Sequence, residues 1–121
     1  MEGNDRVYRF VVSRVVNGDT VEGIVDLGFG ISSKQRFRLD GVVAPSLRSE
    51  DPATRERAKA SKMWLQYRLI KQQVIVKIRE TPKFGHYLAT LFIEGSDVNQ
   101  ELFTSGHVVK FNKKENNNET E

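Results

Sequence analysis

The chain has 121 residues, about the length of one ordinary globular domain. Hydrophobic residues make up 38% of it and charged residues 29%, which is typical of a soluble protein, and no apolar run is long enough to cross a bilayer. The absence of cysteine excludes disulfides, thiolate metal sites and a cysteine nucleophile. A formal charge of +3 favours an anionic partner only weakly, because many proteins of this size carry it. Since no export signal is visible, we expect a cytoplasmic protein that does not bind membranes.

Three antiparallel strands are predicted in the first part of the chain. Residues 6–16 are rich in valine and aromatic side chains, and Asn17-Gly18 supplies a turn. A second strand over residues 19–27 runs into Gly28-Phe29-Gly30, where the glycines can take positive φ. This turn should close a hairpin onto a third strand at residues 33–40.

A long helix is predicted after a loop over residues 41–50. Asp51 suits the N-cap and Pro52 the first helical position, so the helix should begin there and end near Lys71. Apolar residues at spacings near three, four and seven predict its buried face. The residues expected on that face are Ala53, Ala60, Met63, Trp64, Tyr67 and Ile70.

Two further strands and a short helix are predicted in the second half. Residues 74–78 alternate between apolar and polar side chains, and residues 87–93 continue as a fifth strand after a turn. Asp97 is expected to cap a helix over residues 98–105 that Gly106 ends, and residues 107–111 are expected to be extended.

The element order predicts an α+β fold that is mainly β. Five strands with one long helix between the third and fourth, and a short C-terminal helix, match an OB-type β-barrel, although a generic α+β sheet fits the pattern almost as well. We expect one domain over residues 6–112. Residues 1–5 and the polar residues 113–121 should be a flexible N-terminus and a disordered tail.

Three short motifs carry the candidate chemistry: Asn17-Gly18-Asp19-Thr20, the segment from Arg36 to Pro45, and Lys83-Phe84-Gly85-His86. In this order and spacing the chain resembles the staphylococcal-nuclease-like (thermonuclease) family over roughly residues 8–111. The segments 26–31 and 35–39 are most similar to short members encoded by bacteriophages, which would place the protein in a host cell. The resemblance implies an OB-type barrel and a site in which aspartates hold calcium beside a glutamate and two arginines.

Two of the family's site residues are retained and three are replaced. The resemblance implies that Asp19 is a calcium ligand and that Arg38 holds phosphate. Val43 stands in place of the second aspartate, Ser46 in place of the glutamate that activates water, and His86 in place of the second arginine. Ser46 cannot act as a base without activation, and His86 lacks the bidentate fork of arginine. We therefore retain Ser46 and His86 only as weak catalytic candidates.

A lone aspartate should bind calcium weakly, because calcium prefers six to eight oxygen ligands. Asp40 lies two residues after Arg38, on the same strand face, and is a possible relocated metal ligand. The alternative that we favour is that Asp40 pairs with Arg38 or Arg36, or ends the strand in a turn with Gly41. No cofactor is expected, and calcium only if the protein is active.

Basic residues and one aromatic residue predict binding to nucleic acid. The basic residues that the family's barrel would gather around one mouth are Lys34, Arg36, Arg38, Arg48 and Lys83. Phe29, at the tip of the hairpin, could stack on a nucleobase or fold back as a lid on the barrel.

Three functions fit these observations. The first is a nuclease-like protein that binds single-stranded DNA or RNA but hydrolyses it poorly or not at all. The second is an active calcium- or magnesium-dependent phosphodiesterase that uses Asp19 and Asp40. The third is a viral protein-interaction or inhibitor module that retains the fold as a scaffold.

Overall fold

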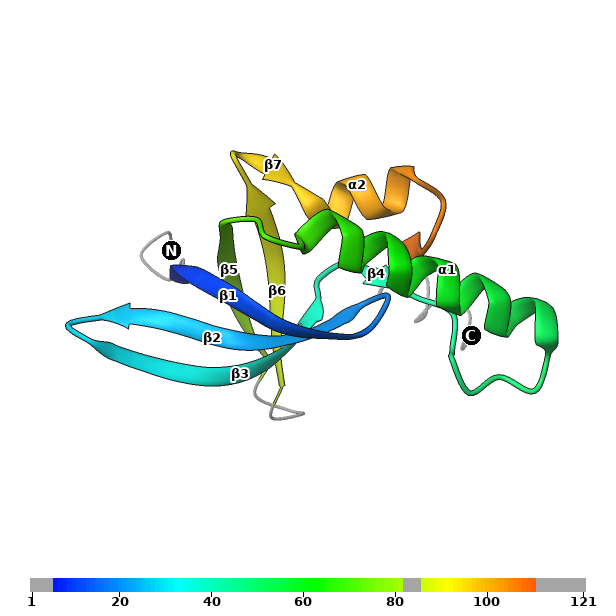
Figure 1. Cartoon of the computed structure of the whole chain (residues 1–121), viewed down its shortest axis with the longest axis horizontal. Helices are drawn as coiled ribbons and strands as arrows, with labels where there is room; N and C mark the ends of the chain where they lie inside the picture. The colour runs from blue at the N-terminus through cyan, green and yellow to red at the C-terminus, as the bar shows by residue number, and fades with distance from the viewer. Residues whose placement is uncertain (1–5, 82–85, 111–121) are drawn as a thin grey trace, which may run out of the picture.

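Five long strands form most of the main sheet in the computed structural model, which describes residues 6–81 and 86–110 (Figure 1). They are β1 (Arg6–Asn17), β2 (Thr20–Gly28), β3 (Ile31–Leu39), β5 (Val74–Thr81) and β6 (His86–Ile93). The sheet order is β3-β2-β1-β5-β6-β7, and β3 also pairs with β6 in parallel over Phe37–Leu39. This last pairing closes the sheet into a barrel, which confirms the predicted α+β fold of OB type.

Apolar side chains fill the inside of the barrel. The rings of Phe10 and Phe37 meet edge to face, with their centroids 5.3 Å apart. Around them lie other fully buried side chains, including Val21, Val25, Leu39, Val76 and Leu91. The predicted flexible ends, residues 1–5 and 113–121, and the turn at residues 82–85 lie outside the described residues.

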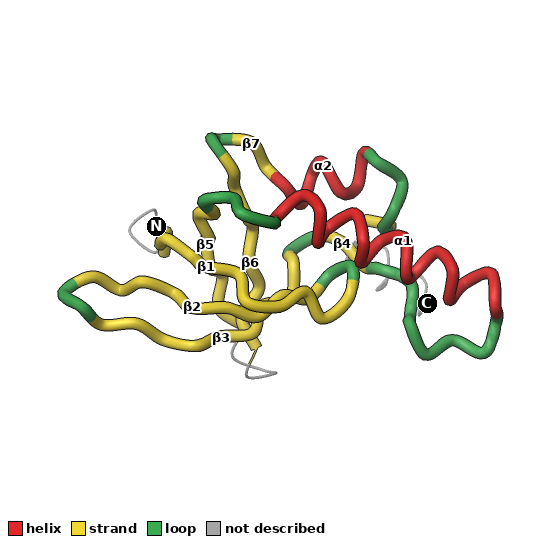
Figure 2. The backbone as a smooth tube through the Cα atoms, viewed as in Figure 1, coloured by secondary structure: helices red, strands yellow, loops and turns green. Residues whose placement is uncertain are grey.

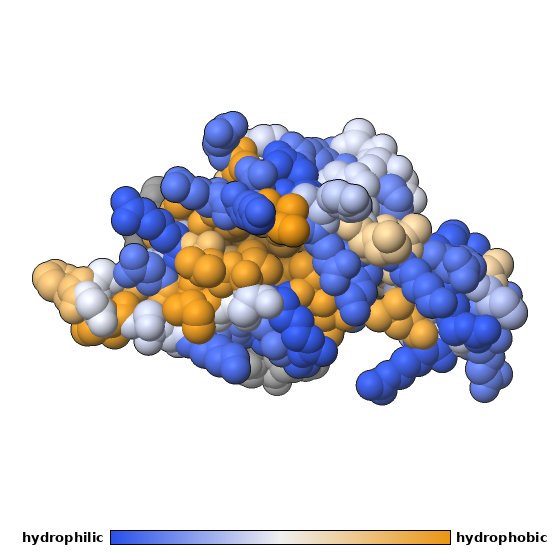
Figure 3. Space-filling view, viewed as in Figure 1, coloured by the Kyte–Doolittle hydropathy of each residue, from blue (hydrophilic) through white to orange (hydrophobic). Residues whose placement is uncertain are grey.

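The predicted hairpin between β2 and β3 is confirmed, and it projects beyond the barrel (Figures 1 and 2). Gly28, Phe29 and Gly30 at its tip all have positive φ, of 85°, 59° and 75°. The Asp26 carboxylate accepts a hydrogen bond from the Gly28 N–H at 2.8 Å and holds the start of the turn. Apolar surface is visible at the far end of this hairpin (Figure 3).

Helix α1 (Pro52–Leu69) begins at the predicted residue. Asp51 is its N-cap, and the Asp51 carboxylate accepts hydrogen bonds from the Thr54 N–H and hydroxyl. The bond from the hydroxyl of Thr54 is the main reason that the pKa of Asp51 lies below its ordinary value. In the described part of the chain, no helix is both long and apolar enough to cross a membrane.

The predicted buried face of α1 is wrong. The buried residues are Ala58, Ser61, Leu65 and Leu69, whereas Met63, Tyr67 and Ile70 have exposed fractions of 57%, 79% and 59%. Ala53 and Ala60 are also exposed, and only Trp64 of the predicted set packs partly against the core. At Ser61 the buried face requires a small residue, because α1 approaches the β1–β2 turn closely there: a Cβ on Gly18 would lie 1.9 Å from the Ser61 Oγ.

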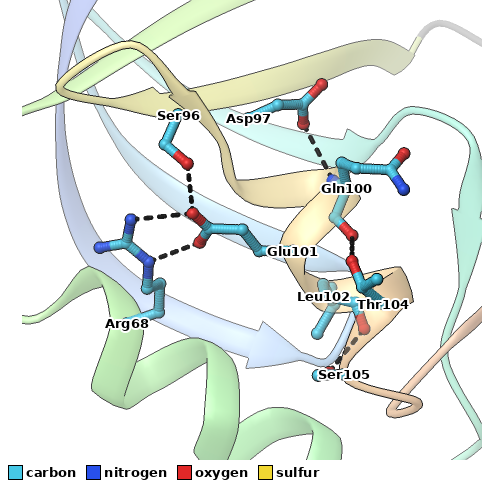
Figure 4. Close-up of polar contacts among 8 residues, drawn as sticks. All are labelled: Arg68, Ser96, Asp97, Gln100, Glu101, Leu102, Thr104 and Ser105. Atoms are coloured by element: carbon cyan, nitrogen blue, oxygen red, sulfur yellow. Dashed lines mark hydrogen bonds and ion pairs between the residues drawn. The ribbon is translucent and has the colours of Figure 1, made fainter.

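Three two-residue strands and a second helix complete the fold. Within the predicted loop of residues 41–50, β4 (Val42–Val43) pairs with β8 (Val109–Lys110). Strand β7 (Ser96–Asp97) leads into α2 (Val98–Thr104), whose N-cap Asp97 accepts a hydrogen bond from the Gln100 N–H at 2.9 Å (Figure 4). The prediction of α2 and its cap is confirmed, whereas β4 and β7 were missed.

An ion pair joins α1 to α2 (Figure 4). The Arg68 guanidinium donates two hydrogen bonds to the Glu101 carboxylate, at 2.6 and 3.2 Å, and the Ser96 hydroxyl donates a third. The hydrogen bond from Arg68 is the largest cause that lowers the pKa of Glu101, followed by that from Ser96. This cluster fixes the end of α1 over the C-terminal part of the chain.

Candidate nucleic-acid interface

Asp19 lies in the turn between β1 and β2 and is almost fully buried. The Asp19 Oδ1 accepts a hydrogen bond from the Thr20 hydroxyl at 2.8 Å. The Asp19 Oδ2 accepts another from the Ala44 N–H, also at 2.8 Å. The first motif is thereby joined to the Ala44-Pro45 pair of the second, 25 residues further along the chain.

Arg38 completes this arrangement from β3. It pairs with Thr20 across the sheet, and its Nη2 lies 3.6 Å from the Asp19 Oδ2. Half of the Arg38 side chain is exposed, so the guanidinium can meet an anion in solvent while it stays beside Asp19. The structure therefore brings Asp19 and Arg38, from two of the three motifs, together with Ala44 of the second motif.

The loop after β4 carries two more predicted site residues. Ser46 and Arg48 are both exposed, and the Ser46 hydroxyl accepts a hydrogen bond from the Arg48 N–H at 3.0 Å. No carboxylate or imidazole forms a hydrogen bond with the Ser46 hydroxyl in the described part of the chain. Nothing there activates this serine as a base. Val43, in the place of the second aspartate, is half-buried in β4.

Asp40 ends β3 in a turn with Gly41, which is one of the predicted alternatives. Its ion-pair partner is Arg79 of β5, however, and not Arg38 or Arg36. Arg79 Nε and Nη2 each lie 2.9 Å from a carboxylate oxygen of Asp40. This bidentate bond raises the pKa of Arg79. Sequence reasoning missed Arg79, because only the closure of the barrel brings β5 near the end of β3.

Arg36 is held by a carboxylate of the neighbouring strand. Arg36 and Arg14 both donate hydrogen bonds to Glu22, and the bond from Arg36 is the largest cause that lowers the pKa of Glu22. The charge of Arg36 is therefore partly neutralised within the sheet. Glu22 was not singled out in the sequence, although it lies directly opposite Arg36 in the pairing of β2 with β3.

Lys34 and Phe29 remain open to solvent. Lys34 is exposed on the same face of β3 as Arg36 and Arg38, and it has no ion-pair partner among the side chains that the structure describes. Phe29 is 100% exposed, so it does not fold back over the barrel as a lid. Lys83 lies outside the described residues. His86 begins β6, where its backbone pairs with Thr81.

The sequence of residues 36–121 matches the family described as staphylococcal nuclease homologue. The chain belongs to this family. The matched range contains Arg38 and Pro45 but begins after Asp19, so the place of Asp19 in the site depends on its contacts with Arg38 and Ala44. No match was found among curated proteins.

In this staphylococcal nuclease homologue, the residues around Asp19 do not fit calcium. Calcium requires several oxygen ligands, mostly carboxylates. Each Asp19 carboxylate oxygen accepts one hydrogen bond, the cation of Arg38 lies 3.6 Å from Oδ2, and Asp40, the other candidate ligand, is paired with Arg79. Within the described ranges no group of three or more histidine or acidic side chains could hold a metal.

Among the described residues, positive charge and one aromatic ring face solvent on this part of the barrel. Arg38 and Lys34 offer charge on one face of β3, Arg48 offers it on the nearby loop, and Phe29 offers an aromatic ring at the hairpin tip. Such groups suit phosphate contacts and base stacking. A base that activates water is absent from this set.

Proposed function

We propose that this staphylococcal nuclease homologue binds single-stranded nucleic acid and hydrolyses it slowly or not at all. The proposal depends mainly on the contacts of the Asp19 carboxylate. Its Oδ2 accepts a hydrogen bond from the Ala44 N–H and lies 3.6 Å from the Arg38 guanidinium. In this position Asp19 holds a loop and orients an arginine, and Arg38 remains half exposed for phosphate.

The spacing of charge on β3 supports the proposal. Lys34, Arg36 and Arg38 alternate on one strand face, so neighbouring members of the row stand about 7 Å apart. Arg36 donates hydrogen bonds to Glu22, whereas Arg38 lies 3.6 Å from Asp19 without such a bond, so Lys34 and Arg38 supply most of the available charge. Phe29 would stack on an unpaired base, which only a single strand presents freely.

Hydrolysis requires a positive centre at the phosphate, an oriented water and stabilisation of the leaving oxygen. Arg38 can serve the first of these requirements. The loss of a general base typically costs roughly 10²–10⁴ in rate, and neither Ser46 nor Asp40 replaces it, since Ser46 is not activated and Asp40 is bound to Arg79.

A titration of a labelled oligonucleotide of about 16 nucleotides, at roughly 50 and 200 mM salt, tests the binding. If Lys34, Arg38 and Arg48 each contact a phosphate, the affinity should fall roughly 20-fold between the two conditions. The double variant Lys34→Ala/Arg38→Ala should bind weakly. The matched control is Arg57→Ala/Lys59→Ala, which removes the same charge from α1 and should bind like the wild type.

The second arm of the experiment tests hydrolysis. The same oligonucleotide is incubated with calcium and, separately, with a chelator, and little cleavage is expected in either. Calcium-dependent cleavage that disappears in both Asp19→Ala and Arg38→Ala would contradict the inactive assignment and support the phosphodiesterase. Absence of binding at low salt would contradict the proposal as a whole.

A further inference from the structure

Helix α1 exposes a stripe of large apolar side chains. Met63, Tyr67 and Ile70 follow one another at spacings of four and three residues, so they lie on one helix face. All three are more than half exposed. The stripe lies on the C-terminal half of α1, whose opposite face is buried through Leu65 and Leu69.

A groove runs beside this stripe, between α1 and β1. It has a volume of about 590 Å³, and Val12 and Val15 line it from β1 while Leu69 and Ile70 line it from the helix end. Ile70 belongs to both the stripe and the groove, so the two form one continuous surface, which we call the α1–β1 groove. None of the residues proposed to bind nucleic acid lines it.

The charge of the α1–β1 groove is entirely positive. Lys62, Lys71 and Arg14 line it, and no acidic residue does among those that the structure describes. Arg14 is paired with Glu22, whereas Lys62 and Lys71 have no ion-pair partner in the described part of the chain. Two free ammonium groups therefore border an apolar surface.

We propose that the α1–β1 groove binds an acidic amphipathic helix of a partner protein. The apolar face of such a helix would cover Met63, Tyr67 and Ile70, and Asp or Glu side chains at its border would meet Lys62 and Lys71. This inference goes beyond the proposed function, because it assigns a second surface with a different ligand.

Other occupants match the groove less well. Residues 113–121 of the chain contain no apolar side chain to cover the stripe. A second copy of the protein would bring Lys62 and Lys71 of both copies together without acidic residues of the groove between them. A nucleic acid would gain phosphate contacts, but only Tyr67 of the stripe offers an aromatic face to a base, since Met63 and Ile70 have no ring.

A designed peptide supplies the probe. It is a helical peptide of about 14 residues, with leucines on one face and glutamates elsewhere, and its control replaces each glutamate by lysine. Binding to the full chain is measured by fluorescence anisotropy, and the contacted residues by NMR shifts. The acidic peptide should bind at least about tenfold more tightly than the lysine peptide. Its shift changes should centre on Tyr67, Ile70 and Lys62.

Substitutions at exposed positions separate docking from folding. The double variant Tyr67→Ala/Ile70→Ala should weaken binding of the acidic peptide at least about tenfold. Val11→Ala, at a β1 residue that is 66% exposed but outside the groove lining, should leave it unchanged. Lys62→Glu/Lys71→Glu should make the protein prefer the lysine peptide over the acidic peptide. Lys34→Glu/Arg48→Glu should weaken oligonucleotide binding and leave binding of the acidic peptide unchanged.

Three results would overturn the proposal. The first is that both peptides bind with equal affinity, or that the Tyr67→Ala/Ile70→Ala change does not weaken binding of the acidic peptide. The second is weaker oligonucleotide binding by Lys62→Glu/Lys71→Glu, which would make the groove a nucleic-acid surface. The third is a dimer in sedimentation experiments that the Tyr67→Ala/Ile70→Ala change dissociates, which would make a second copy the occupant. The peptide results do not depend on oligonucleotide binding, so the two proposals can fail separately.

Discussion

The Asp19 carboxylate accepts a hydrogen bond from the Ala44 N–H at 2.8 Å and thereby joins the β1–β2 turn to the loop that follows β4. The same oxygen lies 3.6 Å from the Arg38 guanidinium. One buried acid thus positions both a loop and the cation that faces solvent. A cation already lies beside this oxygen, and within the described ranges no group of three or more histidine or acidic side chains could hold a metal.

We predict that Asp19→Asn increases affinity for a single-stranded oligonucleotide about two- to fivefold at low salt. Asparagine keeps an oxygen that can accept from the Ala44 N–H, but it removes the negative charge that opposes phosphate beside Arg38. Fluorescence anisotropy measures the change. The control Glu56→Gln alters the net charge equally on an exposed part of α1 and should have a smaller effect. Weaker binding by Asp19→Asn would indicate that the carboxylate itself takes part in binding.

We predict that Gly18→Ala destabilises the protein by about 1–3 kcal/mol. Its new Cβ would lie 1.9 Å from the Ser61 Oγ and 2.9 Å from the Ala44 Cβ, where the turn, the helix and the site loop meet. Urea denaturation measures the loss.

A double-mutant cycle identifies the contact that causes this loss. Ser61→Ala alone should cost little, because the Ser61 Oγ is buried without a hydrogen-bond partner in the described structure. Combined with Gly18→Ala it should recover part of the stability, since the shortest contact disappears. Strict additivity of the two changes would contradict the packing explanation.

We predict that Phe29→Ala weakens oligonucleotide binding by about 1–3 kcal/mol, the range found for base–aromatic stacking. Phe29 is fully exposed, so the removal of its ring breaks no packing and should leave the melting temperature unchanged. Tyr67→Ala is the matched control, because Tyr67 is 79% exposed but lies on α1. If both changes reduce affinity equally, Phe29 has no specific role.

The strands, both helix caps and the hairpin could be predicted because each depends on local sequence. Asp51-Pro52 and Asp97 are N-cap signals that act within one helical turn, and the glycines around Phe29 allow the positive φ values of the turn. Strand β4 could not be predicted in this way, since its two residues are strand only because they pair with Val109 and Lys110.

The buried face of α1 and the partner of Asp40 depend on the tertiary structure. Apolar periodicity favoured Met63 and Tyr67, but close packing against Gly18 requires the small side chain of Ser61 on the inner face. The partners predicted for Asp40 were Arg38 and Arg36, which are close in sequence. The actual partner, Arg79, is 39 residues away and lies beside Asp40 only because the barrel is closed. Asp19 and Arg38, which the motifs singled out separately, lie 3.6 Å apart in the structure, and the roles predicted for them remain predictions.

Our last prediction concerns the ion pair between Arg68 and Glu101. We expect Glu101→Gln to lower the free energy of unfolding by about 1 kcal/mol at neutral pH, because the side chains are mostly shielded and the carboxylate accepts from both Arg68 and Ser96. The folded-state pKa of Glu101 is lowered from 4.5. Its stabilisation is therefore fully present well above pH 4.5 and is lost as the pH falls through the folded pKa.

Urea denaturation of the wild type and Glu101→Gln at several pH values measures this effect. The difference between the two curves should be constant near neutrality and should shrink progressively below about pH 4.5. Glu56→Gln serves as the control, since Glu56 and Lys59 form a largely exposed pair at 3.8 Å and should contribute less. A difference that persists unchanged at pH 3 would show that the Glu101 charge does not stabilise the junction between α1 and α2, and that its contribution comes from packing.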